Sequence, residues 1–177
     1  IKTHKTLAIA HMQVARGAIG IACQKIGEAE VMAAGGVDRD ILIPYNNIGR
    51  QKLDRLTALA RRTKLTVAAD SDYTVNGLSV AAAAEGVTVG VVVELDRGRT
   101  GVASLREAVD FGRRIDSLPG LELRGIMIMP SPPDARPLIQ ETLDLFDRAG
   151  LSHPIVSGGS TAYAFTAHEI PELTEYR

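Results

Sequence analysis

The chain has 177 residues, 20 Lys and Arg against 21 Asp and Glu, a net charge of −1 and 45% hydrophobic residues. The balanced charge and the 4% aromatic content argue against a nucleic-acid partner, and no apolar run is long enough to span a membrane. One cysteine, Cys23, excludes an internal disulfide, and with no signal peptide evident we expect a cytoplasmic protein.

Apolar, β-branched runs alternate with segments of helical periodicity along the whole chain. The pentapeptide Ile1–Lys5 reads as the end of a strand that opens into a helix. The predicted strands after it are 18–22, 41–44, 65–69, 87–95, 121–129, 154–156 and 173–177. The predicted helices are 7–16, 26–34, 50–62, 75–85, 104–115, 137–149 and a short one at 162–167.

Local signals mark several helix ends. Gly17, Gly86 and Gly150 each follow a predicted helix, as C-terminal glycines do. Ser104 and Glu107 have the spacing of a capping box, which predicts that a helix begins there.

Eight strands that alternate strictly with seven helices predict a parallel sheet. The count of eight favours a (β/α)8 TIM-type barrel over an open doubly wound sheet, with residues 1–177 as one barrel domain. The chain is shorter than the roughly 200 residues or more of a usual barrel. It also lacks an initiator methionine and both ends lie in predicted strands, so we expect a fragment truncated at both ends.

Active sites of such barrels lie at the carboxyl ends of the strands, where this sequence places Lys2. A lysine at the mouth of a barrel can form a Schiff base with an aldehyde when its amine is partly desolvated. A solvated strand end is the alternative interpretation of the same residues.

Two further features suit a phosphorylated aldehyde. The turn Ser157-Gly158-Gly159-Ser160-Thr161 follows the seventh predicted strand, where glycines and hydroxyls can hold a phosphate. Arg99 follows the fifth strand and can meet a phenolate, carboxylate or phosphate. A plain loop and a solvated arginine are the competing interpretations. A lysine at one end and a phosphate turn at the other predict pyridoxal 5′-phosphate as the cofactor.

Several motifs resemble fold-type III pyridoxal-phosphate enzymes, in the D-threonine aldolase and D-serine dehydratase branch related to the alanine racemase N-terminal barrel. They are Ile1–Lys5, Gly27–Met32, Asp40–Pro44, Arg99–Val102 and Val156–Ser160. The resemblance implies that Lys2 is the Schiff-base lysine and that Arg99 lies near the 3-oxygen of the cofactor. It also implies that Ser157, Gly158, Gly159, Ser160 and Thr161 form the phosphate turn.

The sequence also departs from this family. Met129 stands where a tyrosine often faces the pyridine nitrogen, and the loop from Asp96 to Arg99 is shorter. The family's C-terminal β domain, which supplies the divalent-metal ligands, is absent, so we expect no complete metal site here. His4 either orients Lys2, contacts the substrate or makes a structural hydrogen bond. By resemblance, the partners are a small amino-acid substrate and a second copy in a homodimer.

The predicted function is that of a lyase using pyridoxal phosphate on a β-hydroxy D-amino acid, through a Schiff base at Lys2. Both a D-threonine aldolase and a D-serine or 3-hydroxyaspartate dehydratase fit this prediction. The alternatives are a non-catalytic barrel for pyridoxal-phosphate homeostasis and an amino-acid racemase. We expect residues 1–177 alone to be inactive as a lyase.

Overall fold

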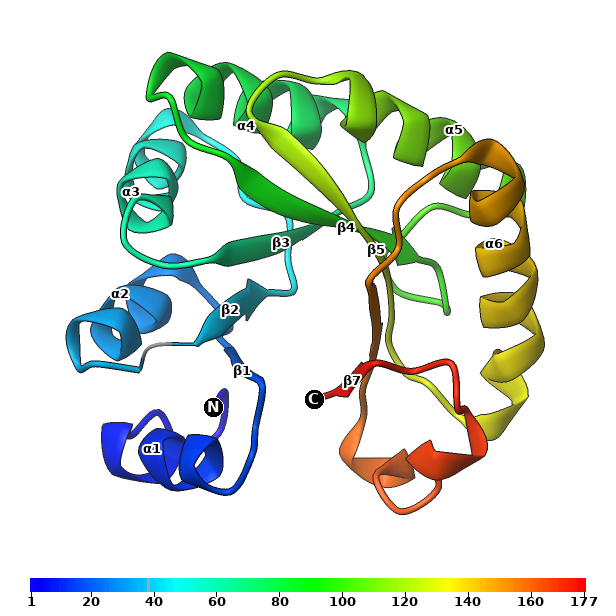
Figure 1. Ribbon diagram of the computed structural model, residues 1–177, viewed down its shortest axis with the longest axis horizontal. Helices are drawn as coiled ribbons and strands as arrows, with labels where there is room; N and C mark the ends of the chain where they lie inside the picture. Colours follow the sequence, from blue (N-terminus) through cyan, green and yellow to red (C-terminus); the bar gives the residue numbers. More distant parts are fainter. Residues whose placement is uncertain (38) are drawn as a thin grey trace.

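The computed structural model describes residues 1–37 and 39–177. Within these residues, one sheet of seven parallel strands follows the order of the chain, and it curls into an open TIM-type barrel with helices α2 to α6 on its outer side (Figure 1). The strands are β1 (Gly20–Ala22), β2 (Asp40–Ile43), β3 (Leu65–Ala69), β4 (Val89–Leu95), β5 (Leu121–Ile128), β6 (Ile155–Gly158) and β7 (Glu175–Tyr176). The predicted α/β barrel class is confirmed.

The helices lie close to their predicted positions. They are α1 (Leu7–Ala15), α2 (Ile26–Ala34), α3 (Arg50–Ala60), α4 (Asp72–Ala84), α5 (Leu105–Ser117) and α6 (Arg136–Ala149), with the short 3-10 helices η1 (Pro133–Ala135), η2 (Thr161–Tyr163) and η3 (Ala167–Glu169). The predicted helix start is confirmed, because Ser104 is the N-cap of α5 and its Oγ accepts from Glu107 N at 3.2 Å. The return bond of the capping box is shifted by one residue, since Glu107 Oε2 accepts from Ala103 N at 2.9 Å rather than from Ser104 N.

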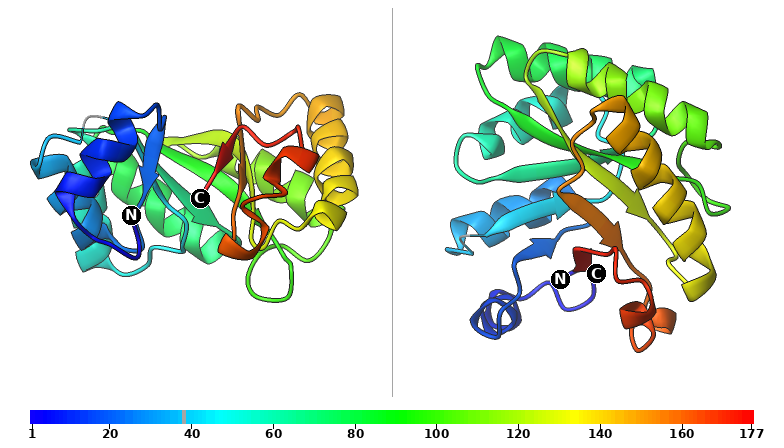
Figure 2. Two further views of the ribbon diagram at one scale, coloured as in Figure 1. Left: turned by 90° about the horizontal axis from the view of Figure 1, so that it is seen from below. Right: turned by 45° about the vertical axis from the view of Figure 1, so that its right-hand side comes forward.

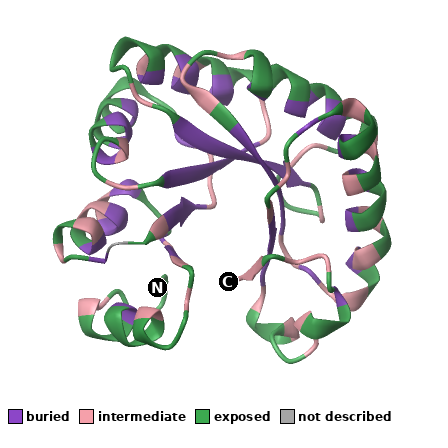
Figure 3. Ribbon diagram, in the orientation of Figure 1, coloured by how far each residue is buried: buried purple, intermediate pink, exposed green. Residues whose placement is uncertain are grey.

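Alternating side chains divide the central strands β2 to β5 between two environments. On β4, Val91 and Val93 belong to the large core between the sheet and its helices, whereas Val92 packs inside the curl with Leu42 and Met127. Both layers are buried, so the central strands are covered on both faces (Figure 3). This double cover explains why β3 and β4 read as continuous apolar runs.

The predicted first strand is wrong. Residues 2–4 form a turn that Lys5 N closes by donating to Ile1 O at 3.0 Å, and the φ angle of Lys5, +48°, ends any extended conformation. A strand needs a neighbour along its length to satisfy its backbone groups, whereas this segment makes one bond to itself and one, from Ile1 N, to Ala22 O. The described residues therefore contain seven strands rather than eight.

The predicted helix at 162–167 is also wrong. The segment holds parts of η2 and η3, which are separated by a turn at residues 164–166. The hydroxyl of Thr166, the last residue of this turn, donates to Tyr163 O at 3.2 Å. A side-chain bond of this kind competes with continued helical hydrogen bonding.

Strands β1 and β7 form the two edges of the sheet, and the two chain ends lie near each other between them (Figures 1 and 2). Strand β5 carries an irregularity: its register against β4 shifts by one residue, so that Val91 pairs with Leu123 but Val92 pairs with Gly125. In the part of the chain that the structure describes, no helix is long and apolar enough to cross a bilayer.

Candidate active site

A cavity of about 530 Å³ lies at the carboxyl ends of the strands, inside the curl of the sheet. It brings together side chains from the N-terminal turn, from the ends of β4 and β5 and from the loops after β4, β6 and β7. The polar or charged residues around it include Lys2, His4, Gln24, Tyr45, Glu94, Arg99, Ser160, Thr161, Tyr176 and Arg177. Five of the eight predicted site residues therefore line one cavity: Lys2, His4, Arg99, Ser160 and Thr161.

Lys2 lies on the turn before α1 rather than on a strand, and its side chain is exposed at the cavity. Among the described residues it has no hydrogen-bond or ion-pair partner. Lys5, three residues later, is instead paired with the carboxylate of Glu28. Only the first of these two lysines thus presents a free amine to the cavity.

His4 is engaged at both ring nitrogens. Its Nδ1 accepts from Thr6 N at 3.2 Å, and its Nε2 lies 3.3 Å from Gln13 Oε1 on α1. Since Nδ1 is an acceptor, the proton belongs on Nε2, which donates to Gln13. Of the roles considered for His4, this geometry favours a structural hydrogen bond that holds the turn of Lys2 against α1.

Arg99 is exposed in the loop that follows β4 and lines the cavity. The carboxylate of Asp96 shapes this loop by accepting from Gly98 N at 2.7 Å and from Arg99 N at 3.1 Å. Gly101 N donates to Asp70 Oδ2 at 3.1 Å, which ties the loop to the end of β3. The short loop therefore has a defined shape that holds the base of Arg99.

The Ser157–Thr161 turn divides into two parts. Ser157 and Gly158 belong to β6 and are buried with Gly159, whereas Ser160 and Thr161 line the cavity. Ser157 Oγ donates to Glu175 Oε1 at 2.6 Å, and Gly159 N donates to Ser131 Oγ at 2.9 Å. The part of the turn that lines the cavity therefore consists of its last two residues, Ser160 and Thr161, and both carry a hydroxyl.

Arg177 is a cavity residue that sequence reasoning missed. Its guanidinium donates to Ser157 Oγ at 3.1 Å and contacts Met129 Sδ at 3.6 Å, so it faces the position where the family pattern has a tyrosine. A Cβ added at Gly159 would come within 2.6 Å of Arg177 Nη1, which places this positive charge beside the turn. Burial lowers the pKa of Arg177, but a guanidinium still stays charged at neutral pH.

Glu94 is the second cavity residue that sequence reasoning missed. Its carboxylate lies inside the apolar run 87–95, and this unusual position was a signal that could have identified it. It is 7% exposed, faces the cavity from β4 and accepts from Thr100 Oγ1 at 2.8 Å. Burial raises the pKa of Glu94 and the nearby carboxylate of Asp70 adds to this, while Thr100, Arg177 and Arg99 act in the opposite direction.

We expect Glu94→Gln to stabilise the protein at neutral pH. The pKa of Glu94 is higher in the folded protein than in the unfolded chain. The free energy of unfolding of the wild type therefore falls as the pH rises from the unfolded-state pKa through the folded-state pKa, and it stays lower above that range. Glutamine keeps an acceptor for Thr100 without the buried charge. We expect Tm at pH 7 to rise by about 2–4 °C, the change that roughly 1 kcal/mol produces in a chain of this size. Calorimetry at pH 7 and pH 4 checks this, because the gain should shrink at the lower pH; an equal gain at both would contradict it.

Two further features bear on the chemistry of the protein, namely the thiol of Cys23 and the distribution of possible metal ligands. Burial raises the pKa of Cys23 to about 12, so this thiol at the cavity stays protonated and is a poor nucleophile. Across residues 1–37 and 39–177, no three His, Cys, Asp or Glu side chains gather closely enough to hold a metal ion.

Comparison with known proteins relates the chain to a family. The family model described as "Alanine racemase, N-terminal domain" matches residues 1–177. A 3-hydroxy-D-aspartate aldolase of Paracoccus denitrificans (strain Pd 1222) is 31% identical over 186 residues, which cover 94% of this chain and 48% of that protein.

Two solved structures share the fold. The D-threonine aldolase of Filomicrobium marinum superposes with a TM-score of 0.90 at 33% identity, over 98% of this chain and 51% of that one. The D-threo-3-hydroxyaspartate dehydratase of Delftia sp. HT23 gives a TM-score of 0.81 at 26% identity, over 98% and 50%. The chain thus spans about half the length of these relatives. Because the family model matches the whole chain, this protein belongs to the alanine racemase N-terminal domain family.

Proposed function

We propose that the protein is a pyridoxal-phosphate-dependent lyase that acts on a β-hydroxy D-amino acid, with Lys2 as its Schiff-base lysine. The observation that carries this proposal is the amine of Lys2, which has no partner among residues 1–37 and 39–177, and Lys2 lines the same cavity as Arg99 and Ser160. The substrate class is supported by the relatives, which are named as aldolases or a dehydratase for D-threonine or 3-hydroxyaspartate.

The cavity fits the cofactor in size and charge. Its volume of about 530 Å³ lies within the roughly 300–1,000 Å³ of small-molecule sites. The cavity-facing hydroxyls of Ser160 and Thr161, with the Arg177 guanidinium beside the turn, suit a phosphate dianion.

The residues divide the binding of the cofactor among them. Lys2 would bond the aldehyde carbon, and Arg99 would donate to the 3-oxygen. Ser160 and Thr161 would hold the phosphate, while Ser157 and Gly158 of β6 and the following Gly159 would support them. When bound, pyridoxal phosphate stabilises negative charge that develops at the substrate α-carbon.

Lys2 also has a role after binding. With pyridoxal phosphate and substrate bound, the Lys2 amine would be the natural base for the proton on the α-carbon in a dehydratase. In an aldolase that proton stays in place and the bond from Cα to Cβ breaks instead. The products therefore distinguish the two reactions.

Reductive trapping tests the proposal. Treatment of the cofactor-loaded protein with borohydride should fix a pyridoxyl group on one lysine, and tandem mass spectrometry can separate Lys2 from Lys5. We expect the adduct on Lys2, because Lys5 is held by Glu28. An adduct on Lys5 or on any other lysine would reject the assignment.

Product analysis tests the substrate class. D-threonine should yield glycine and acetaldehyde in an aldolase, whereas D-serine or D-3-hydroxyaspartate should yield an oxoacid and ammonia in a dehydratase. L-threonine serves as the matched control and should not react. Racemisation of alanine without either product set would replace the lyase with a racemase.

A further inference from the structure

The turn that carries Lys2 is fixed at points other than Lys2 itself. Ile1 N donates to Ala22 O at 3.1 Å, beside the end of β1, and Lys5 N closes the turn onto Ile1 O at 3.0 Å. Lys2 lies between these two anchors with its own side chain free. The backbone path at Lys2, from which its side chain extends, is therefore set by the anchors at residues 1 and 5 together with the hydrogen bonds of His4.

Lys5 has an unfavourable backbone conformation. Its φ of +48° lies in the left-handed region, which residues with a long side chain rarely adopt. The ammonium of Lys5 pairs with Glu28 Oε1 on the first turn of α2. The ion pair holds the chain in a conformation that a lysine would otherwise avoid.

Glu28 is suited to act as a fixed anchor. It is 8% exposed, lies near the positive N-terminal end of α2, and its second oxygen, Oε2, accepts from Gln24 N at 2.7 Å. Although burial raises the pKa of Glu28, the hydrogen bonds from Lys5 and Gln24 outweigh it and hold the pKa below its usual value. One carboxylate thus joins the Lys2 turn, the segment after β1 and α2.

We propose that the Lys5–Glu28 pair is the positioning device of the active site, which holds the Lys2 turn so that the Lys2 amine faces the cavity. This inference rests on the proposed function, since it assigns a purpose to the pair only if Lys2 carries the cofactor. Lys5 and Glu28 are positioning residues, because their charged groups bind each other and not the cofactor.

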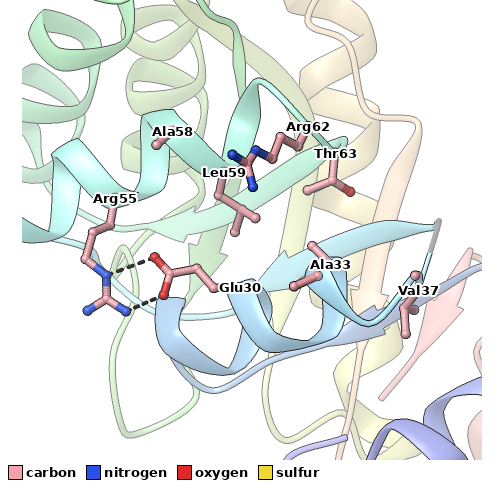
Figure 4. A pocket seen from close by; sticks show the side chains of 10 residues that line it. Glu30, Ala33, Val37, Arg55, Ala58, Leu59, Arg62 and Thr63 are labelled. Carbon is pink, nitrogen blue, oxygen red and sulfur yellow. Dashed lines mark hydrogen bonds and ion pairs between the residues drawn. The ribbon is translucent and has the colours of Figure 1, made fainter.

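The same helix supplies a matched control. Glu30, two residues beyond Glu28, pairs with Arg55 of α3, and Arg55 Nε donates to Glu30 Oε1 at 2.9 Å. Figure 4 shows this pair at the groove between α2 and α3. Within the described part of the chain, no residue that lines this groove also lines the cavity of Lys2. Glu30→Gln therefore removes an ion pair of α2 without touching the Lys2 turn.

The test compares Glu28→Gln with Glu30→Gln in the cofactor-loaded full-length protein. We expect Glu28→Gln to lower kcat by roughly 10- to 100-fold, the cost of a small misplacement of a reacting group, with KM nearly unchanged. The pH at which the cofactor absorbance titrates should also shift. Glu30→Gln should leave kcat and the titration at wild-type values. Equal behaviour of the two variants would overturn the inference.

Two variants of Lys5 separate positioning from folding. Lys5→Asn keeps a residue that tolerates positive φ but cannot reach Glu28, so we expect the same fall in kcat. Lys5→Arg keeps the charge and should recover most of the activity. If Glu28→Gln does not fold, Lys5→Asn decides alone, and wild-type kcat in that variant overturns the inference.

The proposed function and this inference fail differently. If borohydride leaves no adduct on Lys2 of the wild-type protein, the proposed function fails and the inference falls with it. If Lys2 is trapped but Glu28→Gln and Lys5→Asn react like the wild type, only the positioning role is lost.

Discussion

Replacement of Lys2 by alanine is expected to abolish the covalent link to pyridoxal phosphate and to lower kcat by roughly 10³-fold or more. The structure gives the reason: Lys2 is the lysine with a free amine at the cavity, and the neighbouring Lys5 is held in its ion pair with Glu28. The visible absorbance of the cofactor should move to that of the free aldehyde, which a spectrum at matched protein concentration measures directly.

Controls make this result specific. Lys52→Ala removes an exposed lysine on the outer helix α3 and should change neither spectrum nor rate. A small primary amine added to Lys2→Ala should restore part of the activity in proportion to its concentration, since the missing group is an amine. An unchanged cofactor spectrum in Lys2→Ala would remove Lys2 from the site.

Elements with a strong local signal were predicted well from the sequence. Residues 26–34 were predicted as a helix and form α2, and residues 65–69 were predicted as a strand and form β3. The helix start at Ser104 is likewise confirmed. Periodicity and capping act within a few residues, so they can be recognised without knowledge of the fold.

The N-terminal turn could not be predicted in the same way. Whether Ile1–Lys5 extends depends on a neighbouring strand, and here the segment bonds to itself and to Ala22 O. Glu28 was part of a family motif, yet nothing local showed that its carboxylate would meet Lys5 from 23 residues away. Contacts between distant segments exist only after the sheet has curled.

Among the residues that line the cavity, Lys2, Arg99 and the end of the turn after β6 were predicted from the sequence. The charged residues Glu94 and Arg177 of the same cavity were not predicted. Arg177 enters the cavity because β7 pairs with β6 in a particular register, which places Tyr176 opposite Gly158 and Arg177 just beyond it. A two-residue strand has no periodicity from which to infer that direction. The exposed residues Lys2 and Arg99 were thus predictable from sequence motifs. The position of Arg177 depends on the register between β6 and β7, which the sequence alone does not give.

The same dependence on register makes Gly125 the position where a single methyl group should destabilise the fold most. Gly125 lies in the irregularity of β5 with φ +125°, and an added Cβ would approach Ile155 O of β6 to 2.0 Å. That oxygen belongs to the backbone of a paired strand, so it cannot move aside without breaking the sheet. Alanine there would combine backbone strain with a steric clash, for a loss of about 4 kcal/mol.

A loss of this size is a large part of the roughly 5–15 kcal/mol that stabilises a typical domain. We expect Gly125→Ala to lower Tm by roughly 8–16 °C or to prevent folding, as measured by thermal unfolding followed by circular dichroism. Gly77→Ala is the matched control, because Gly77 lies within α4 and its added Cβ would meet only Leu53 Cδ1, at an ordinary 3.6 Å. That variant should gain about 0.5–1 kcal/mol from better helix propensity. Opposite signs for the two substitutions would show that the bend of β5 requires glycine, whereas a Gly125→Ala protein as stable as the wild type would mean that β5 can pair with β6 without it.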